Sequence, residues 1–268
     1  MGFYMRNERN RARFAEEALE GGENSLIFGR NAVMELIRSG RSVDKIFIAT
    51  GEREGSITVI AAEAKARGIP VVDIDRKKLD RMANGLNHQG VCASAAEKEY
   101  VTIEEILGIA AERGEPPFVV VADGVEDPHN LGAIIRCAEG AGAHGIIIPK
   151  RRSVGVTATV ARASAGAVEH MAIARVTNIP SAIDELKESG LWIYGAEADG
   201  AAYYDTDMTG AAAIVLGSEG KGISRLVREK CDFVVSIPMY GKVNSFNVST
   251  AAAVLLLEAA KQRHKSQR

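Results

Sequence analysis

The sequence predicts an α/β protein with a mainly parallel sheet in its C-terminal half and a smaller α/β unit before it. Short apolar runs alternate with helical segments along the chain, which is the pattern of parallel strands joined by crossover helices. From residue 118 onward the strands are continuous apolar runs, as in sheets that helices cover on both faces. Polar or glycine-rich loops follow several of these strands, where ligands of such sheets bind.

The N-terminal part is expected to hold a charged tail and one small unit. Residues 1–22 are rich in arginine and glutamate and form the tail, with a short helix over 11–19. Residues 23–96 form the small α/β unit. Its expected helices span 31–37, 57–67 and 75–82, with Asp75 as a cap, and its strands span 43–50, 69–74 and 91–95. His88 lies in the loop 84–90 and could contact RNA. A lone histidine in a loop is, however, more often neither a ligand nor a catalyst.

Residues 97–117 are predicted to be a linker, and residues 118–268 to be the second domain. The linker starts with charged residues, holds one amphipathic helix over 103–111 and ends in Gly-Glu-Pro-Pro. In the second domain, the predicted strands cover 118–122, 145–148, 171–176, 191–196, 212–216 and 233–237. The predicted helices cover 131–141, 157–165, 179–187, 223–230 and 250–260.

Composition excludes several classes of protein. The chain has 268 residues, of which 46% are hydrophobic and only 5% aromatic, which disfavours a base-stacking platform for single strands. With a formal charge of −2, RNA contact would depend on the local basic clusters at 6–13, 150–152 and 261–268. Three cysteines without a C-x-x-C pair predict no metal site and no disulfide framework. Without a signal peptide or an apolar span, we expect a cytoplasmic protein that does not contact membranes.

The first polar loop carries the segment Asn130 to Arg136, N-L-G-A-I-I-R. Asn130 stands where a helix N-cap is expected, and Gly132 would allow another backbone to approach the helix. Arg136 follows nearly two turns later among small residues. Taken alone, this segment favours a simple cap and a surface arginine over a functional site.

The second loop is L-G-S-E-G-K-G-I, from Leu216 to Ile223. Three glycines in so short a loop predict a tightly folded backbone that approaches another group closely. Lys221 is followed by glycine, which excludes a Walker A loop, and the glycine order excludes the dinucleotide fingerprint of dehydrogenases. For Glu219, the simplest interpretation is a partner for a helix N-terminus.

The third loop joins an apolar strand end to a long helix over the segment from Ile237 to Glu258. It holds polar residues, among them Ser245, Asn247 and Ser249, at a strand-to-helix turn, where free amides can face a ligand. An ordinary N-cap at Asn247 or Ser249 explains this loop equally well. The recurrence of such loops after three strands favours a site.

Together, three motifs resemble those of the SpoU (TrmH-type) RNA ribose 2′-O-methyltransferases, which belong to the SPOUT class. The motifs are N-x-G-A-x-x-R, L-G-x-E-G-x-G and I-P-M-x-G-x-x-x-S-x-N-V-S-x-A, in this order over residues 118–260. Each is weak alone, and their combination is specific. The small N-terminal unit resembles the ribosomal-protein-like RNA-binding domain of the RlmB-type subgroup. Phe246 is a departure, because many relatives have leucine there.

The resemblance implies a deep trefoil knot in the C-terminal domain, a homodimer, and S-adenosyl-L-methionine as cofactor. It implies that Gly217, Ile237 and Phe246 bind this cofactor, with Ala196 and Glu197 as weaker candidates. It also implies catalytic roles, which fall on Asn130, Arg136, Glu219, Ser245 and Asn247.

The expected reaction is transfer of a methyl group to a ribose 2′-hydroxyl of RNA, and a guanosine of 23S ribosomal RNA is the favoured target. Arg136 is expected to act as a cation that clamps the target phosphate, because an arginine is effectively always protonated. Transfer RNA as substrate, an adenosine target, and a catalytically silent RNA-binding protein of the same fold remain alternatives. A nucleotide-binding dehydrogenase is disfavoured by the missing fingerprint.

Overall fold

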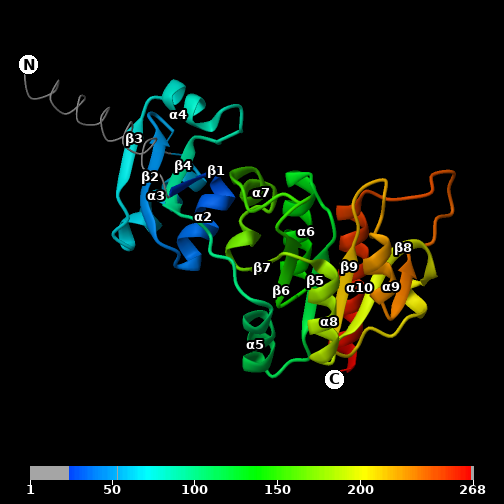
Figure 1. Ribbon diagram of the computed structural model, residues 1–268. Coiled ribbons are helices and arrows are strands. Elements are labelled where there is room, and N and C mark those ends of the chain that lie inside the picture. Colours follow the sequence, from blue (N-terminus) through cyan, green and yellow to red (C-terminus); the bar gives the residue numbers. More distant parts are fainter. Residues whose placement is uncertain (1–23, 53, 267–268) are drawn as a thin grey trace, which may run out of the picture. The chain divides into compact units, whose positions relative to one another are not determined.

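The computed structural model describes residues 24–52 and 54–266, which form two compact units divided between Lys98 and Glu99 (Figure 1). The predicted tail over residues 1–22 and its helix lie outside the described residues. Within the described ranges, none of the helices combines the length and the apolar character that a membrane span requires.

The first unit is a four-stranded mixed sheet with three helices among its described residues. Its strands are β1 (Asn24–Phe28), β2 (Val43–Ala49), β3 (Val71–Ile74) and β4 (Val91–Ala96), in the spatial order β1-β4-β2-β3. Strand β4 runs antiparallel to both of its neighbours, whereas β2 and β3 are parallel. Helices α2 (Arg30–Ser39), α3 (Ser56–Ala66) and α4 (Arg76–Ala83) complete the unit.

All six elements predicted in this unit occur within two residues of their expected bounds, and the third helix starts at Arg76, after its cap. Asp75 caps α4 as expected, because its side chain accepts a hydrogen bond from the amide of Lys77. Strand β1 was not predicted. Its sequence, N-S-L-I-F, follows directly on the charged tail, and its antiparallel pairing with β4 is a long-range contact that local periodicity does not reveal.

The second unit is built on a six-stranded sheet, parallel throughout the described pairs, in the order β10-β8-β9-β5-β6-β7. Its strands are β5 (Phe118–Ala122), β6 (Gly145–Pro149), β7 (Ala172–Val176), β8 (Trp192–Ala202), β9 (Ala212–Leu216) and β10 (Phe233–Ser236). Strands β5 and β9 are fully buried apolar runs at the centre. In their register Ala122 lies beside Leu216, so the loops after these two strands start side by side.

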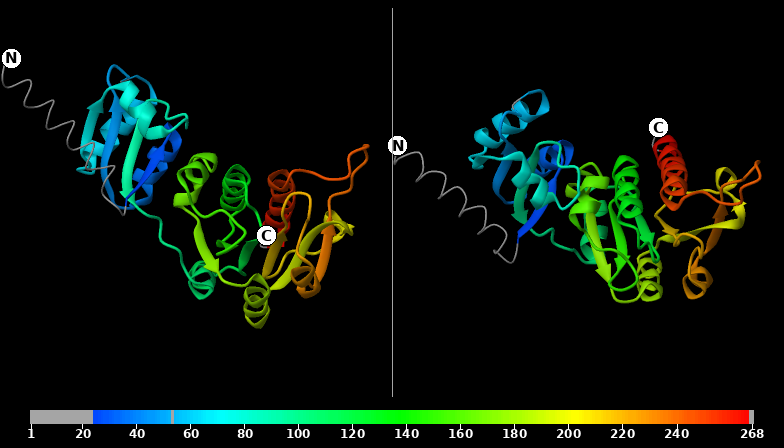
Figure 2. Two further views of the ribbon diagram at one scale, coloured as in Figure 1. Left: turned by 45° about the horizontal axis from the view of Figure 1, so that its top comes forward. Right: turned by 90° about the horizontal axis from the view of Figure 1, so that it is seen from above.

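Helices cover both faces of this sheet, as the apolar strands predict (Figure 2). Helices α5 (Ile103–Arg113), α8 (Ile179–Glu188) and α9 (Arg225–Lys230) share one core with inward residues of the strands, such as Val119 and Val215. On the other face, α6 (Pro128–Gly140) packs against α7 (Ala158–Ala163) and α10 (Val248–Ser266). Short 3-10 turns at Ala167–Glu169 and Tyr203–Asp205 complete the unit.

Helix α5 belongs to the second unit, although its sequence lies in the predicted linker. Ile103 and Ile106 are buried in the core of this unit. Gly145 on β6 makes room for the helix, because a Cβ atom there would lie 2.6 Å from the side chain of Ile106. The helix carries a capping box between Thr102 and Glu105, which fixes its first turn.

Two details of the prediction at the functional loops are wrong. Helix α6 begins at Pro128 with Asp127 as its N-cap, so Asn130 lies in the first turn and is not the cap. A proline is favoured at the first helical position, and this signal places the start earlier than Asn130. Strand β8 is also longer than predicted and continues to Ala202 past the charged residues Glu197 and Asp199.

The mainly parallel α/β fold and the small additional α/β unit are as predicted. The trefoil knot stays a prediction, since the order of strands describes which strands are neighbours and not how the chain is threaded.

Candidate functional site

A pocket of about 690 Å³ opens beside the middle of β8 and the carboxyl ends of β9 and β10. This is the edge of a parallel sheet at which ligands are expected to bind. The pocket is lined by the middle of β8, the glycine-rich loop after β9, the loop after β10 and the start of α10. Eight of the ten site residues predicted from the sequence line it: Ala196, Glu197, Gly217, Glu219, Ile237, Ser245, Phe246 and Asn247.

The glycine-rich loop folds back on itself. The amide of Ser218 donates to the carbonyl of Gly222 at 3.0 Å, and the amide of Gly222 donates back at 2.9 Å. Gly217 is buried beneath this turn, and a Cβ atom there would lie 2.1 Å from the carbonyl carbon of Gly222. Gly220 and Gly222 have positive φ angles of 76° and 64°, which favour glycine. The close approach predicted for this loop is therefore to its own backbone.

The carboxylate of Glu197 holds the same loop from the side of β8. Its Oε1 accepts a hydrogen bond from the amide of Ile223 at 2.6 Å, and a Cβ atom on Gly222 would lie 2.5 Å from it. The sequence suggested Glu197 as a cofactor contact, and its nearest partner within the chain is this loop. Asp123 also holds the backbone at the end of this loop, because its Oδ2 accepts a hydrogen bond from the amide of Ser224 at 2.8 Å. This residue was not among the predicted site residues. Its position directly after the buried strand β5 was the available signal.

Asn247 links three segments that are far apart in the sequence. Its Nδ2 donates to Asn130 Oδ1 at 3.0 Å and to Glu219 Oε1 at 2.5 Å. Its Oδ1 accepts from the amide and the hydroxyl of Ser249 at 2.9 Å and 2.6 Å, which makes Asn247 the cap of α10. The capping and functional interpretations of the third loop are thus compatible, because the amide oxygen caps the helix while the amide nitrogen joins the other two loops.

Asn130 and Arg136 are the two predicted site residues that do not line the pocket. Asn130 is 7% exposed and reaches the site through Asn247. Arg136 is exposed on α6. Gly132, between them, allows α7 to approach, because a Cβ atom there would lie 2.5 Å from the Cβ of Ala163. This glycine therefore serves helix packing.

The thiol behind the pocket is not suited to be a nucleophile. Cys231 lies under the strand β8, where a Cβ atom on Gly195 would be 2.8 Å from its Sγ. Burial, with a smaller contribution from Asp232, raises the pKa of Cys231 to about 11. The thiol is therefore protonated at neutral pH. The pocket instead offers amide, hydroxyl and carboxylate groups and loop backbone, which can bind and orient a substrate.

Comparison with known proteins assigns the family. The model of the SpoU rRNA Methylase family matches residues 117–257, and that of the RNA 2′-O ribose methyltransferase substrate-binding domain matches residues 26–101. The chain belongs to the SpoU methylase family. It is thus an RNA methyltransferase by family, as the three motifs predicted. A Bacillus subtilis protein assigned to the TrmH family of tRNA/rRNA methyltransferases is 45% identical over 90% of this chain and 97% of its own length.

A second such relative, from Staphylococcus haemolyticus, is 48% identical over 91% of this chain and 98% of its own length. Among solved structures, the SpoU methyltransferase AviRb of Streptomyces viridochromogenes, in complex with AdoMet, covers 92% of this chain and 93% of its own at a TM-score of 0.75. An AdoMet-bound rRNA methyltransferase of Sinorhizobium meliloti covers 90% and 88% at a TM-score of 0.73. These two share only 23% and 24% sequence identity with the chain and support the fold alone.

Proposed function

We propose that this protein transfers a methyl group from S-adenosyl-L-methionine to a ribose 2′-hydroxyl of ribosomal RNA, with a guanosine of 23S ribosomal RNA as the target. The observation that carries the proposal is the joining of the three motif loops at one pocket by Asn247, Asn130 and Glu219 in a SpoU-family chain. The unit at residues 26–101, which matches a substrate-binding family model, favours a large structured RNA.

The pocket suits a nucleoside-like cofactor. Its volume of about 690 Å³ lies within the usual range for small-molecule sites, and it combines apolar side chains with the backbone of the glycine loop. We assign cofactor contacts to Gly217, Ile237 and Phe246, with Ala196 beside them. Glu197 would act by holding the glycine loop in shape. S-adenosylmethionine, when bound, supplies a methyl group activated on a sulfonium.

The chain's own task is to position the ribose hydroxyl in line and to ease the loss of its proton. We assign direct positioning to Ser245 at the pocket wall, and an indirect role to Asn247, which fixes the loops because Asn130 and Glu219 take up both of its amide hydrogens. Arg136 would stabilise the developing alkoxide as a permanent cation and clamp the adjacent phosphate. The proton would leave to that phosphate or to solvent.

Because Arg136 lies outside the lining of the pocket in its own chain, its role fits a target nucleotide bound between two subunits. We therefore propose that the protein is a homodimer. Large apolar side chains near the site support this, since Leu257 on α10 is 55% exposed and Val243 in the third loop is 68% exposed. Light scattering of the purified protein would give the mass of a dimer, and a monomer would contradict the proposal.

Transfer RNA is the second candidate substrate. An A. aeolicus TrmH/SpoU tRNA modifying enzyme resembles this chain at a TM-score of 0.52 and covers 57% of it. The extra N-terminal unit favours ribosomal RNA over this alternative.

The test is methylation of defined RNA with labelled S-adenosylmethionine. Purified protein is incubated with protein-free ribosomal RNA, or with transfer RNA, from a strain that lacks the enzyme, and the RNA is then digested to nucleosides. Labelled 2′-O-methylguanosine from large-subunit RNA is the expected result. Label only in transfer RNA would overturn the ribosomal substrate, and absence of both label and cofactor binding would favour a silent RNA-binding protein.

A further inference from the structure

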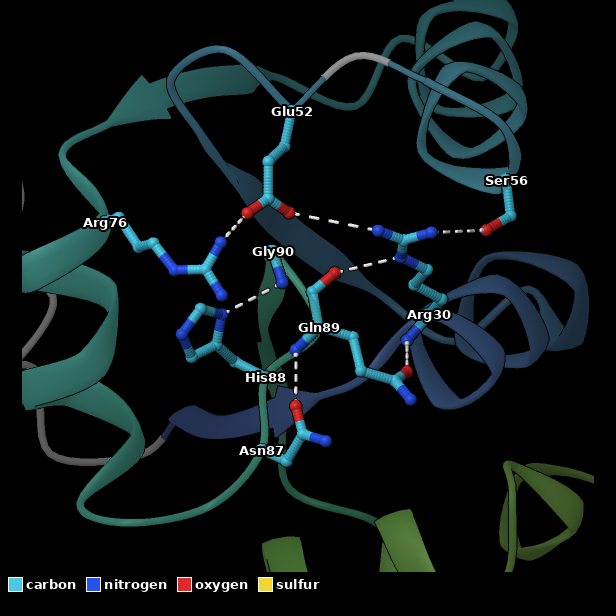
Figure 3. A network of polar contacts seen from close by, with 8 residues as sticks. All are labelled: Arg30, Glu52, Ser56, Arg76, Asn87, His88, Gln89 and Gly90. Carbon is cyan, nitrogen blue, oxygen red and sulfur yellow. Dashed lines mark hydrogen bonds and ion pairs between the residues drawn. The ribbon is translucent and has the colours of Figure 1, made fainter.

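We propose that the N-terminal unit contacts the RNA phosphate backbone through an arginine pair, Arg30 and Arg76, that Glu52 holds on one surface. This inference rests on the proposed function, because it takes RNA to be the substrate of the methyltransferase site. It adds a binding site in the first unit, formed by the start of α2, the turn after β2, the start of α4 and the turn before β4 (Figure 3).

Glu52 lies between the two guanidinium groups (Figure 3). Its Oε1 forms an ion pair with Arg76, and its Oε2 lies 3.8 Å from an Nη atom of Arg30. The side chains of Arg76 and Arg30 remain 62% and 37% exposed, whereas that of Glu52 is 26% exposed. One carboxylate thus orders two cations and leaves a net charge of +1. A guanidinium carries five N–H donors, so Arg76 keeps donors for a phosphate while it pairs with Glu52.

The turn before β4 fixes Arg30 from the other side. The Nε of Arg30 donates to the carbonyl of Gln89 at 2.9 Å, and its backbone amide donates to Gln89 Oε1 at 2.9 Å. Gln89 has a φ of +52°, an uncommon conformation for a residue other than glycine, and the amide oxygen of Asn87 accepts from its backbone N–H at 3.2 Å. Such a conformation persists where surrounding contacts hold it, often at functional sites.

Gly90 is the position that allows this arrangement. It has a φ of +81°, and a Cβ atom there would lie 1.9 Å from Oε2 of Glu52. The same residue's amide donates to Nδ1 of the buried His88, whose Nε2 lies 2.8 Å from the carboxylate of Asp80. His88 therefore braces the turn from inside, and it is not placed to contact RNA, which agrees with the commoner role considered for it.

The charge on α4 also favours an anionic partner. Its first turn has no acidic side chain and begins with Arg76, Lys77 and Lys78. Cations at a helix N-terminus oppose the helix dipole, and the carboxylate of the N-cap Asp75 balances only one of these three charges. A surface that combines these cations with exposed amide side chains at Asn87 and Gln89 is suited to phosphate and sugar groups. The unit's match to a substrate-binding family model favours RNA over an acidic protein as this partner.

The test compares Arg76→Gln with Arg38→Gln in the full chain. Arg38 is a matched control, because its side chain is 56% exposed and is paired with Glu35, in the last turn of α2. Binding of protein-free large-subunit ribosomal RNA is measured by filter retention over a series of salt concentrations, without cofactor. Arg76→Gln should weaken binding about threefold to tenfold and reduce the salt slope by about one, and Arg38→Gln should leave both unchanged.

Arg76→Lys separates charge from folding, since it should keep most of the salt slope and the wild-type melting temperature. In the methylation assay, Arg76→Gln should raise KM for RNA while the cofactor dissociation constant stays as in the wild type. Equal RNA binding by Arg76→Gln and wild type would overturn the inference and leave the proposed function intact. If the wild type binds RNA more tightly than Arg76→Gln but methylates no RNA, the inference would hold and the proposed function would be overturned.

Discussion

The side-chain amide of Asn247 donates to Oδ1 of Asn130 at 3.0 Å across 117 positions of sequence. Asn247 precedes α10, and Asn130 lies in the first turn of α6, so this bond ties together the starts of two packed helices. The same amide bonds Glu219 of the glycine loop. A single donor group thereby sets the relative positions of all three motifs.

Substitution of Asn247 should separate capping from catalysis. Asn247→Asp keeps an oxygen acceptor for the start of α10 but removes the amide donor and sets a carboxylate against Glu219. We expect the melting temperature to fall only slightly, because the cap is kept. We expect kcat to fall by about a hundredfold, because loss of the bonds to Asn130 and Glu219 lets the three loops shift, and a misplacement of about 1 Å can cost this much. Asn247→Ala should in addition lose about 0.5–2 kcal/mol of stability. Full activity of Asn247→Asp would contradict the positioning role.

The Gly217→Ala substitution should damage the cofactor pocket. The added Cβ atom would meet the backbone of Gly222 at 2.1 Å, so the loop must shift, at a cost of about 1–3 kcal/mol. We expect a lower melting temperature and weaker binding of S-adenosylmethionine by calorimetry. Gly108→Ala on α5 is the control, since a Cβ atom there has open space. Equal cofactor affinity in both variants would rule out this account of Gly217.

Arg136 should affect the chemical step and not cofactor binding. For Arg136→Ala we expect kcat to fall about a hundredfold to a thousandfold, because an oriented cation at the developing charge is lost. The dissociation constant of S-adenosylmethionine should not change, since Arg136 lies outside the pocket lining of its chain. Arg225→Ala removes another exposed arginine, 78% exposed on α9, and should retain full turnover. Intact turnover of Arg136→Ala would end the proposed role.

His144 should make the protein less stable as the pH falls. Its side chain is buried, its Nδ1 accepts the amide of Phe118 at 2.9 Å, and its Nε2 lies 3.0 Å from Glu115. Burial lowers the pKa of His144 below its usual value, an effect that Glu115 opposes and that Arg113 and Arg263 reinforce.

The unfolded chain therefore binds a proton first, and the free energy of unfolding decreases as the pH falls below about 6.5, until His144 also titrates in the folded state. Thermal unfolding of His144→Gln across this range should show a flatter pH dependence than the wild type. His129→Gln, which changes an exposed histidine on α6, should keep the wild-type slope. Parallel curves for wild type and His144→Gln would contradict the assignment.

Much of the fold and most of the lining of the candidate pocket could be predicted from the sequence. The apolar runs at 118–122 and 212–216 mark central strands to the residue, because burial on both faces leaves few other residue types possible. The three motifs follow strands whose carboxyl ends share one edge of a parallel sheet, so eight of the ten predicted site residues line one pocket. The N-cap at Asp75 could also be predicted, because a cap depends only on residues that are neighbours in the sequence.

The tertiary structure alone decided what these groups touch. Strand β1 forms by pairing with β4, and Asn130 proved to be a link and not a cap, because its partner is 117 positions away. Glu197 and Asp123 hold the glycine loop, and Glu52 joins two arginines from separate helices. Local sequence sets helix, strand and turn through backbone preferences, whereas such hydrogen bonds and ion pairs require distant segments to meet, and this depends on how the whole core packs.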